Sequence, residues 1–155
     1  MLNGAPKTLL LVSSSGGVLL DLLALRPWWS RHRTVWAAVR AADTASALHG
    51  EAVHWLCDVS LRHPLTPARG FLQAWRVIRE ERPQLIVSAG SGVAIPFFLV
   101  ARLRGIPTFW ISTLNVIAVP GISAQICARL SSRVLLQQAS LLKAHPSGIV
   151  IGELY

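Results

Sequence analysis

The chain has 155 residues, of which 52% are hydrophobic and 14% are charged, and its mean hydropathy is +0.48. Its longest uninterrupted apolar run, Val93 to Ala101, is about half of the roughly 20 residues that a bilayer span needs, which excludes a membrane-crossing helix. Fifteen Lys and Arg against seven Asp and Glu give a net charge of +8, so anionic partners are expected, and the length fits one domain over residues 1–155.

Short apolar or β-branched runs alternate with helical stretches along the whole chain. This alternation is typical of a parallel sheet covered by helices on both faces, which predicts a doubly wound α/β fold. The runs expected to form strands are Thr8–Ser13, Thr34–Val39, Ala52–Asp58, Gln84–Ala89, Pro107–Ser112, Arg133–Gln137 and Gly148–Gly152.

Two helices between these strands have clear limits. The first is expected before Pro83, and the second runs from after Gly92 to Gly105, a usual helix end. In the first, the apolar face is predicted to contain Phe71, Leu72, Trp75 and Ile78, and the polar face Arg76, Arg79 and Glu80.

The turn after the first strand, "SSSGGV", is a candidate ligand site, because ligands of such sheets bind beyond the carboxyl ends of the strands. The amides of Ser14, Ser15, Gly16 and Gly17 would face an anion at the start of a helix. The turn lacks the Lys of a phosphate loop and is not a G-x-G-x-x-G fingerprint. The alternative is an ordinary turn, with Asp21 in the first helical turn to favour the helix dipole.

Two further turns are expected at the same edge of the sheet. After the fourth strand, Gly90, Ser91 and Gly92 precede a helix, and two helix starts aimed at one crevice suit an anionic or sugar ligand. The alternative there is close packing that needs glycine. After the fifth strand, Thr113 and Asn115 lie in a turn rich in small residues.

The loop after the third strand carries Arg62 and His63, which could bind phosphate and exchange a proton, or could simply fix a proline-rich loop. Cys57 and Cys127 show no paired metal-ligand spacing, and the five histidines form no zinc pattern. We therefore expect no metal and no cofactor, and we interpret both cysteines as buried, reduced thiols.

Three stretches together resemble the PssD-type subunits of oligosaccharide biosynthesis: "SSSGGVLLDLLAL", "ERPQLIVSAGSGVAIPFFLVARLRGIPTFWIS" and "LLQQASLLKAHPSGIVIGELY". This family is similar to the amino-terminal, Rossmann-like half of two-domain GT-B glycosyltransferases such as MurG. The resemblance implies a single Rossmann-like domain that handles a lipid-linked acceptor, while a catalytic partner chain binds the nucleotide sugar.

The sequence departs from the family pattern at several positions. Val18 stands where the family usually has His, whereas the acid three residues later is matched by Asp21. The acidic and basic residues that the family tends to have after the fifth strand are missing here. The family also has a Gln-Trp pair near the sixth strand, and this chain matches only its first residue, as Gln137. The resemblance therefore leaves Asp21 as the candidate catalytic base.

The segment after the first helix has the composition of an interfacial membrane anchor. Indole rings settle at the headgroup level while Arg meets lipid phosphate, which predicts a peripheral membrane protein. The resemblance implies that it lies at the cytoplasmic face of the membrane. The alternative is that the first helix buries its leucines on two faces and that the tryptophans after it cap the core. The residues expected to contact the membrane are Leu22, Leu23, Trp28, Trp29, Arg31 and Arg33.

The sequence thus predicts the acceptor-binding, membrane-associating subunit of a two-chain glycosyltransferase. The alternative is a non-catalytic scaffold that recruits the catalytic subunit to the membrane. Nucleic-acid binding through the +8 charge is disfavoured, because no strand face interleaves aromatic and basic residues.

Overall fold

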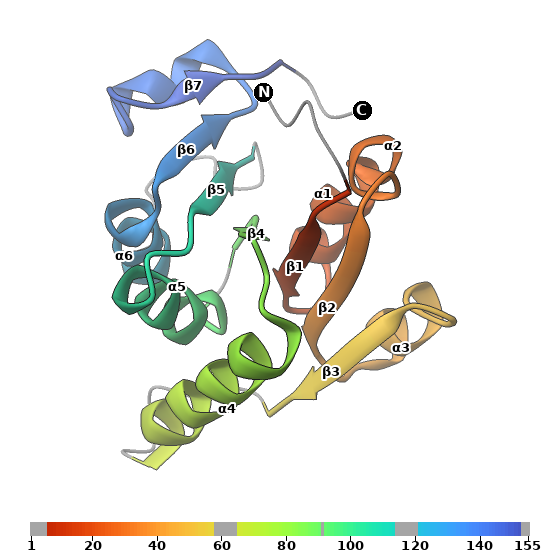
Figure 1. The fold of residues 1–155 in the computed structure, drawn as a ribbon. Helices are drawn as coiled ribbons and strands as arrows, with labels where there is room; N and C mark the ends of the chain where they lie inside the picture. Colours follow the sequence, from red (N-terminus) through yellow and green to blue (C-terminus); the bar gives the residue numbers. More distant parts are fainter. Residues whose placement is uncertain (1–5, 58–64, 91, 114–120, 153–155) are drawn as a thin grey trace.

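The computed structural model describes residues 6–57, 65–90, 92–113 and 121–152. A sheet of seven strands in the order β3-β2-β1-β4-β5-β6-β7 runs through these residues, and every neighbouring pair is parallel (Figure 1). The doubly wound, Rossmann-like α/β fold expected from the sequence is therefore confirmed. The strands are β1 (Thr8–Ser13), β2 (Arg33–Val39), β3 (Ala52–Leu56), β4 (Leu85–Ser88), β5 (Thr108–Ser112), β6 (Arg133–Leu136) and β7 (Ile149–Val150).

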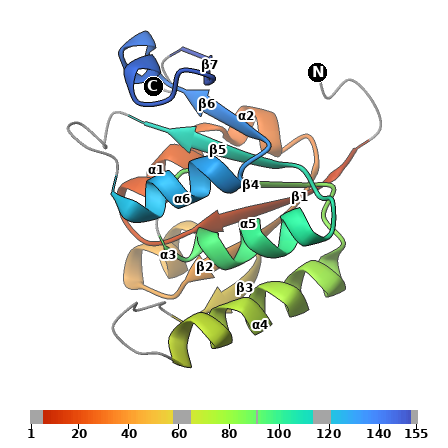
Figure 2. The ribbon, with the colours of Figure 1, turned by 90° about the vertical axis from the view of Figure 1, so that its left-hand side faces the viewer.

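Helices form a layer on each face of the sheet (Figure 2). Right-handed crossovers place the helices that follow β1 and β2 on one face and those that lead to β4, β5 and β6 on the other. The first face carries α1 (Gly17–Ala24), α2 (Arg26–Trp29) and α3 (Ala42–Ala47); the second carries α4 (Leu65–Glu81), α5 (Ala94–Leu103) and α6 (Ile122–Leu130). A short 3₁₀ helix, Ala139–Lys143, joins β6 to β7. Among the described residues, no helix has both the length and the apolar character of a bilayer span.

The sheet separates two apolar cores. Between the sheet and α4–α6, the rings of Phe98 and Trp110 meet edge to face with centroids 6.1 Å apart. Between the sheet and α1–α3, Trp36 is fully buried and meets Trp29 edge to face at 5.7 Å. Because β1 lies inside the sheet, between β2 and β4, Leu9, Leu10, Leu11 and Val12 are buried on both sides, as the continuous apolar run predicts.

Helix α4 buries a different face from the one predicted. Its buried residues are Gly70, Ala74, Val77 and Ile78, whereas Leu72 and Trp75 are 67% and 40% exposed. The small residues at 70 and 74 allow the helix to approach its neighbours closely, and the larger side chains are turned outward. The prediction holds for Ile78 and for the partly buried Phe71, and is wrong for Leu72 and Trp75.

The predicted membrane contact of α1 and α2 is wrong for two residues. Leu22 and Trp29 are buried, and the indole Nε1 of Trp29 donates a hydrogen bond to the carbonyl oxygen of Leu22 at 2.9 Å. This bond pins the tryptophan inside the core, so Trp29 caps the core as the alternative interpretation proposed. Leu23 and Trp28 are half-buried, and Arg31 and Arg33 are exposed.

The two cysteines have different environments. Cys127 is fully buried, and this burial raises the pKa of its thiol to about 12, which makes it an inert core residue. Cys57 is exposed, so the expectation that it is buried is wrong. Both thiols are free, as predicted.

Candidate functional site

A pocket of about 350 Å³ lies where β1, β4 and β5 end at the carboxyl edge of the sheet. The chain leaves β1 and β4, which are neighbours, toward opposite edges of the sheet, so the pocket lies at the topological switch point where ligands of such folds bind. Its lining comes from α1, the turn after β4, the end of β5 and the start of α6: Gly17, Val18, Asp21, Ala89, Gly90, Trp110, Thr113, Gly121, Ser123 and Ala124.

The β1–α1 turn is fixed from the side by a carboxylate of α3. Gly16 adopts a φ of 78°, a conformation that favours glycine, and its amide donates a hydrogen bond to Oδ2 of Asp43 at 2.8 Å. The hydroxyl of Ser13 donates to the carbonyl oxygen of Ser14 at 2.7 Å. Because the amide of Gly16 is occupied, any anion at this turn would meet the first amides of α1 instead.

Asp21 lies in the second turn of α1, not in the first turn as the sequence suggested. Its side chain is 1% exposed and belongs to the pocket lining, where it already has an interaction partner. Among the described residues that line the pocket, it is the sole ionisable one. A carboxylate in this position has the chemistry needed to accept a proton from a hydroxyl group bound in the pocket.

The β4–α5 turn packs directly onto α1. A Cβ atom at Gly90 would lie 2.7 Å from Cγ2 of Val18, so any other residue at position 90 would require Val18 or the turn to shift. The buried hydroxyl of Ser88 donates to the carbonyl oxygens of Val12, at 2.8 Å, and Gly90, at 3.2 Å, and so ties β4 to β1 at this edge. The structure therefore agrees with the packing interpretation of Gly90, and the residue also forms part of the wall.

Beside α1 and the β4–α5 turn, the pocket is lined by the end of β5 and the start of α6. Thr113 is 2% exposed, and Gly121 is the residue before the first turn of α6. The Oγ atom of Ser123 would lie 3.6 Å from a Cβ atom added to Gly92. The wall thus offers hydroxyl groups and helix amides, which bind the oxygen atoms of sugars and phosphates.

Four predicted site residues come together in the lining: Gly17, Asp21, Gly90 and Thr113. Ser14, Ser15, Gly16 and Gly92 lie in the adjoining turns, outside the lining. The predictions for Arg62, His63, Ser91 and Asn115 fall outside the described residues. Sequence reasoning missed Val18, Ala89, Trp110, Gly121, Ser123 and Ala124, although a glycine followed by an apolar helical stretch signals the start of α6.

The positive potential in the pocket comes from helix ends and not from basic side chains, and the carboxyl group of Asp21 lies beside them. Within the described lining there is no Lys, Arg or His, while α1 and α6 begin at the pocket and direct their partial positive charge into it. No cluster of His, Cys, Asp or Glu that could hold a metal ion occurs in the part of the chain that the structure describes. The geometry suits a neutral or anionic, oxygen-rich ligand.

The chain is similar in sequence to N-acetylglucosamine transferases, whereas no family model matches it. It is 32% identical over 125 residues to the UDP-N-acetylglucosamine–N-acetylmuramyl-(pentapeptide) pyrophosphoryl-undecaprenol N-acetylglucosamine transferase of Roseiflexus sp. strain RS-1. The alignment covers 81% of this chain and 25% of that enzyme. The homologues are therefore MurG-type transferases that use a UDP-sugar, and the similarity is to their amino-terminal half.

Solved structures confirm the fold. MurG of Acinetobacter baumannii superposes with a TM-score of 0.73 at 20% identity, over 87% of this chain and 42% of MurG. UDP-N-acetylglucosamine 2-epimerase of Rickettsia bellii superposes with a TM-score of 0.74 at 14% identity, over 97% of this chain and 46% of the epimerase. The chain thus has the fold of one half of GT-B proteins and spans less than half the length of these proteins.

Proposed function

We propose that this chain is the acceptor-binding, membrane-associating subunit of a two-chain glycosyltransferase of the PssD type. It would act at the cytoplasmic face of a membrane, where a partner chain supplies the nucleotide sugar and the acceptor is a lipid-linked saccharide or a polyprenyl lipid. The observation that carries this proposal is the pocket at the β1–β4 switch point, in a domain homologous to the amino-terminal half of MurG-type enzymes.

The size and lining of the pocket support the acceptor as its ligand. At about 350 Å³ it is at the small end of the roughly 300–1,000 Å³ that ligand pockets occupy, so it has room for the reacting end of one substrate. The hydroxyls of Thr113 and Ser123 can orient sugar hydroxyls, and the helix starts at Gly17 and Gly121 favour a phosphate group. The nucleotide sugar would be held by the other half of the enzyme.

The proposed chemistry is an inverting sugar transfer. Asp21 would accept the proton of the acceptor hydroxyl as its oxygen forms a bond to the anomeric carbon of the sugar. The bond from that carbon to the nucleoside diphosphate breaks, and the diphosphate leaves on the partner chain. Holding both substrates in line supplies much of the rate enhancement, which explains why one half would be almost inactive by itself.

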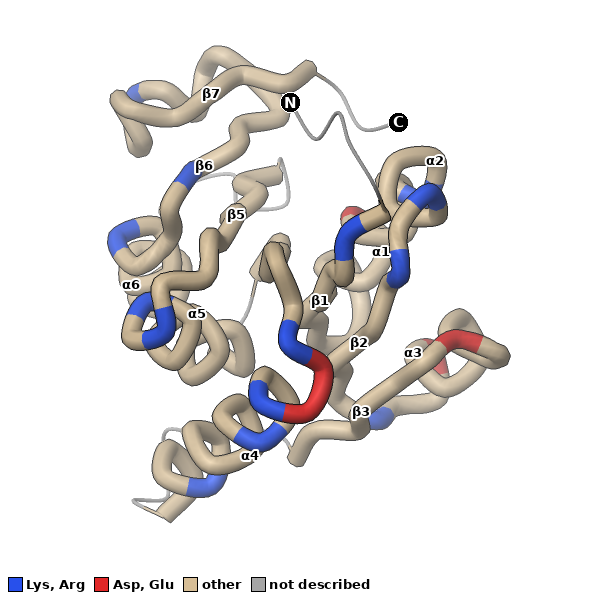
Figure 3. Tube along the Cα trace, viewed as in Figure 1, with Lys and Arg blue, Asp and Glu red and all other residues tan. Residues whose placement is uncertain are grey.

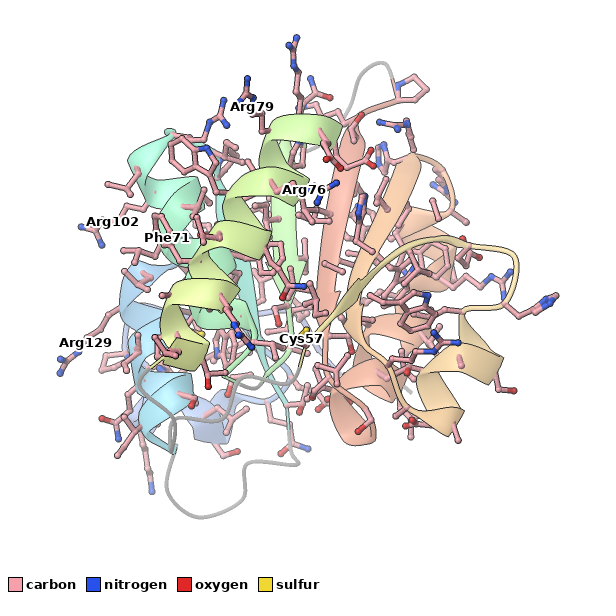
Figure 4. The ribbon with its side chains drawn as sticks, turned by 90° about the horizontal axis from the view of Figure 1, so that it is seen from below. Cys57, Phe71, Arg76, Arg79, Arg102 and Arg129 are labelled. Carbon is pink, nitrogen blue, oxygen red and sulfur yellow. The ribbon has the colours of Figure 1, made fainter. Side chains whose placement is uncertain are left out.

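The surface that supports membrane association is formed by α4 and α5, and not by α1 and α2. We call it the α4–α5 surface; its apolar residues are 39–67% exposed, and its arginines are exposed as well. Figure 3 shows Lys and Arg positions along both helices, and Figure 4 labels Arg76 and Arg79 on α4 and Arg102 on α5. The apolar members are Leu72, Trp75, Leu99 and Leu103, and the basic members are Arg69, Arg76, Arg79, Arg102 and Arg104.

This arrangement has the chemistry of an interfacial contact. The guanidinium carbon of Arg104 lies 5.4 Å from the ring centroid of Trp75, so a cation and an indole are presented together. Exposed leucines can enter the headgroup region while the arginines meet lipid phosphates. Two arginines are already paired with carboxylates of α4: Arg76 with Glu80 and Arg33 with Glu81, each at 2.9 Å.

A non-catalytic scaffold remains the second candidate. Two observations favour it: Asp21 is buried and already has an interaction partner, and no basic side chain lines the described part of the pocket. In this case the chain would position the acceptor or the partner without moving a proton. Substitution of Asp21 separates the two candidates, as described below.

Equilibrium binding to the purified chain tests the assignment of the pocket. Isothermal titration with a short-chain polyprenyl diphosphate-linked saccharide should show binding, whereas UDP-N-acetylglucosamine should show none. Ser123→Leu, which fills the pocket wall, should weaken acceptor binding, and Ser140→Leu, which changes an exposed serine outside the lining, should not. Binding of the nucleotide sugar instead of the acceptor would contradict the proposal.

A further inference from the structure

Trp110 of β5 is the one aromatic residue among the described lining residues of the pocket at the carboxyl edge. The residue is 2% exposed, and its strand lies between β4 and β6 inside the sheet. Its ring meets that of Phe98 on α5 edge to face, with the centroids 6.1 Å apart. Packing from the sheet and from α5 therefore holds the indole in place at the wall of the pocket.

The indole nitrogen of Trp110 is a buried donor without an acceptor. In the part of the chain that the structure describes, two buried side-chain donors lack a hydrogen-bond partner, and they are Nε1 of Trp110 and Nε1 of Trp36. An indole N–H can only donate a hydrogen bond, so an oxygen atom must come to it. Because an unpaired buried donor costs free energy, most such groups in folded proteins are paired, and each exception calls for a reason.

The surroundings of the two indoles differ. Each ring belongs to an apolar core, and the other buried members of that core carry no side-chain oxygen atom that could accept its proton. Trp36 is fully buried and is not among the lining residues of the pocket. Trp110 lines the pocket together with the hydroxyl groups of Thr113 and Ser123 and the start of α6. A ligand in the pocket would therefore contact Trp110 and not Trp36.

We propose that the indole N–H of Trp110 donates a hydrogen bond to an oxygen atom of the ligand in this pocket and so helps to position it. The inference rests on the proposed function for the identity of the ligand, a lipid-linked acceptor with phosphate and saccharide oxygens. Binding would pair a donor that is unpaired in the free chain, so part of the cost of burying the N–H group is recovered in the complex.

The position of Trp110 gives this hydrogen bond a distinct place in the pocket. Trp110 belongs to the core between the sheet and α4–α6, and Ser123 lies in the first turn of α6. Asp21 belongs to α1, which packs on the opposite face of the sheet. Trp110 and Ser123 would therefore hold the ligand from the α6 side, while the carboxyl group of Asp21 faces it from the α1 side.

Trp36→Phe is the matched control for Trp110→Phe. Each substitution removes a buried indole with an unpaired N–H and keeps an aromatic ring, but only Trp110 lines the pocket. We expect Trp110→Phe to weaken binding of a short-chain polyprenyl diphosphate-linked saccharide by about tenfold, the scale of one hydrogen bond. Trp36→Phe should bind as wild type does. Unfolding in urea checks that both variants are folded.

NMR spectroscopy of the ¹⁵N-labelled wild-type chain observes the indole proton itself. The chain has six tryptophans, so six indole N–H signals are expected, and triple-resonance assignment identifies that of Trp110 even if Trp110→Phe does not fold. We expect saturating ligand to move the Trp110 signal downfield, as a new hydrogen bond does, and to leave the Trp36 signal unchanged. A purely structural role of Trp110 would produce no such shift.

The same polyprenyl diphosphate without its saccharide identifies the oxygen atom that accepts the proton. A downfield shift with both ligands would assign the hydrogen bond to a phosphate oxygen. A shift with the saccharide-bearing ligand alone would assign it to the sugar. Either result supports the inference, because both ligands present the oxygen chemistry that an indole N–H can bind.

The outcomes also separate this inference from the proposed function. If wild type binds the saccharide-bearing ligand and the Trp110 signal does not move downfield, the role of Trp110 is wrong and acceptor binding stands. Equal loss of affinity in the two variants, or no loss in a folded Trp110→Phe, would overturn the inference in the same way. If wild type binds neither ligand, the acceptor assignment of the pocket fails and the inference fails with it.

Discussion

Gly90 lies so close to Val18 that a Cβ atom at position 90 would be 2.7 Å from Cγ2 of the valine. The contact joins the turn after β4 to the start of α1, and both residues line the pocket at the carboxyl edge. The contact therefore fixes the spacing between α1, which carries Asp21, and the β4–α5 turn on the neighbouring wall of the pocket.

Gly90→Ala should destabilise the fold and change the pocket, because its methyl group must displace Val18 or the turn. We expect the free energy of unfolding in urea to fall by about 1–3 kcal/mol, as for overpacked cores. Gly92→Ala is the control: its Cβ atom would be at an ordinary 3.6 Å from Oγ of Ser123. Similar losses in both variants would show that the contact with Val18 is not the cause.

Asp21→Asn separates the catalytic and scaffold candidates. If Asp21 accepts the proton, the complex should form normally and its transfer rate should fall by roughly 10²–10⁴-fold. If the chain is a scaffold, neither the amount of complex nor the transfer rate should change. Because Asp21 is buried and has an interaction partner, the unfolding free energy is measured alongside, and Glu51→Gln on the surface serves as the control.

The α4–α5 surface should bind vesicles that contain phosphatidylglycerol. Leu72→Glu with Leu103→Glu changes residues that are 67% and 66% exposed, and we expect sedimentation with vesicles to weaken by about tenfold or more. Leu20→Glu on α1, where the leucine is 59% exposed, should bind as wild type. Binding should also weaken as salt is raised. If Leu20→Glu lost more vesicle binding than Leu72→Glu with Leu103→Glu, the membrane contact would lie on the α1 side of the molecule, which would contradict this prediction.

Glu81 makes the stability of the protein depend on pH. The hydrogen bond with Nε2 of His54, at 2.7 Å, and that from Arg33, at 2.9 Å, hold the pKa of Glu81 below its ordinary value. Since the folded pKa is the lower one, the stabilisation is complete above the ordinary pKa of about 4.3 and is lost as the pH falls through the folded pKa.

Glu81→Gln should therefore lower the free energy of unfolding at pH 7 by about 1.5–3 kcal/mol, the scale of a hydrogen bond to a charged group. The difference from wild type should shrink as the pH falls below the ordinary pKa of a glutamate and through the lower, folded pKa of Glu81. Glu80→Gln removes an exposed pair with Arg76 and should have no measurable effect. A difference that is constant between pH 7 and pH 3 would contradict the role of the ionised carboxylate.

The sequence identified the elements that depend on strong local patterns. The apolar run at Leu9–Val12, the turn at Gly16 and the helix end at Gly105 all lie where they were expected, because glycines with positive φ and continuous apolar strands are local signals. The carboxyl-edge location of the site follows from the same alternation, and Asp21 and Thr113, both candidates from the sequence, line one pocket there.

The errors arose where tertiary contacts decide the outcome. Nothing local shows that Gly70 and Ala74 form the buried face of α4 while Trp75 faces outward. In the same way, the hydrogen bond from Trp29 to Leu22 turns a sequence with the composition of a membrane anchor into part of the core. Ser123 was missed because its place in the pocket depends on how α6 packs beside β5.

The most direct test of the central claim is transfer of labelled sugar from UDP-N-acetylglucosamine to a polyprenyl diphosphate-linked saccharide. It is measured with this chain alone, with the partner chain alone and with both chains together on vesicles. The account predicts product only when both chains are present. Turnover by this chain alone at an ordinary enzymatic rate, about 1–10³ s⁻¹, would contradict it.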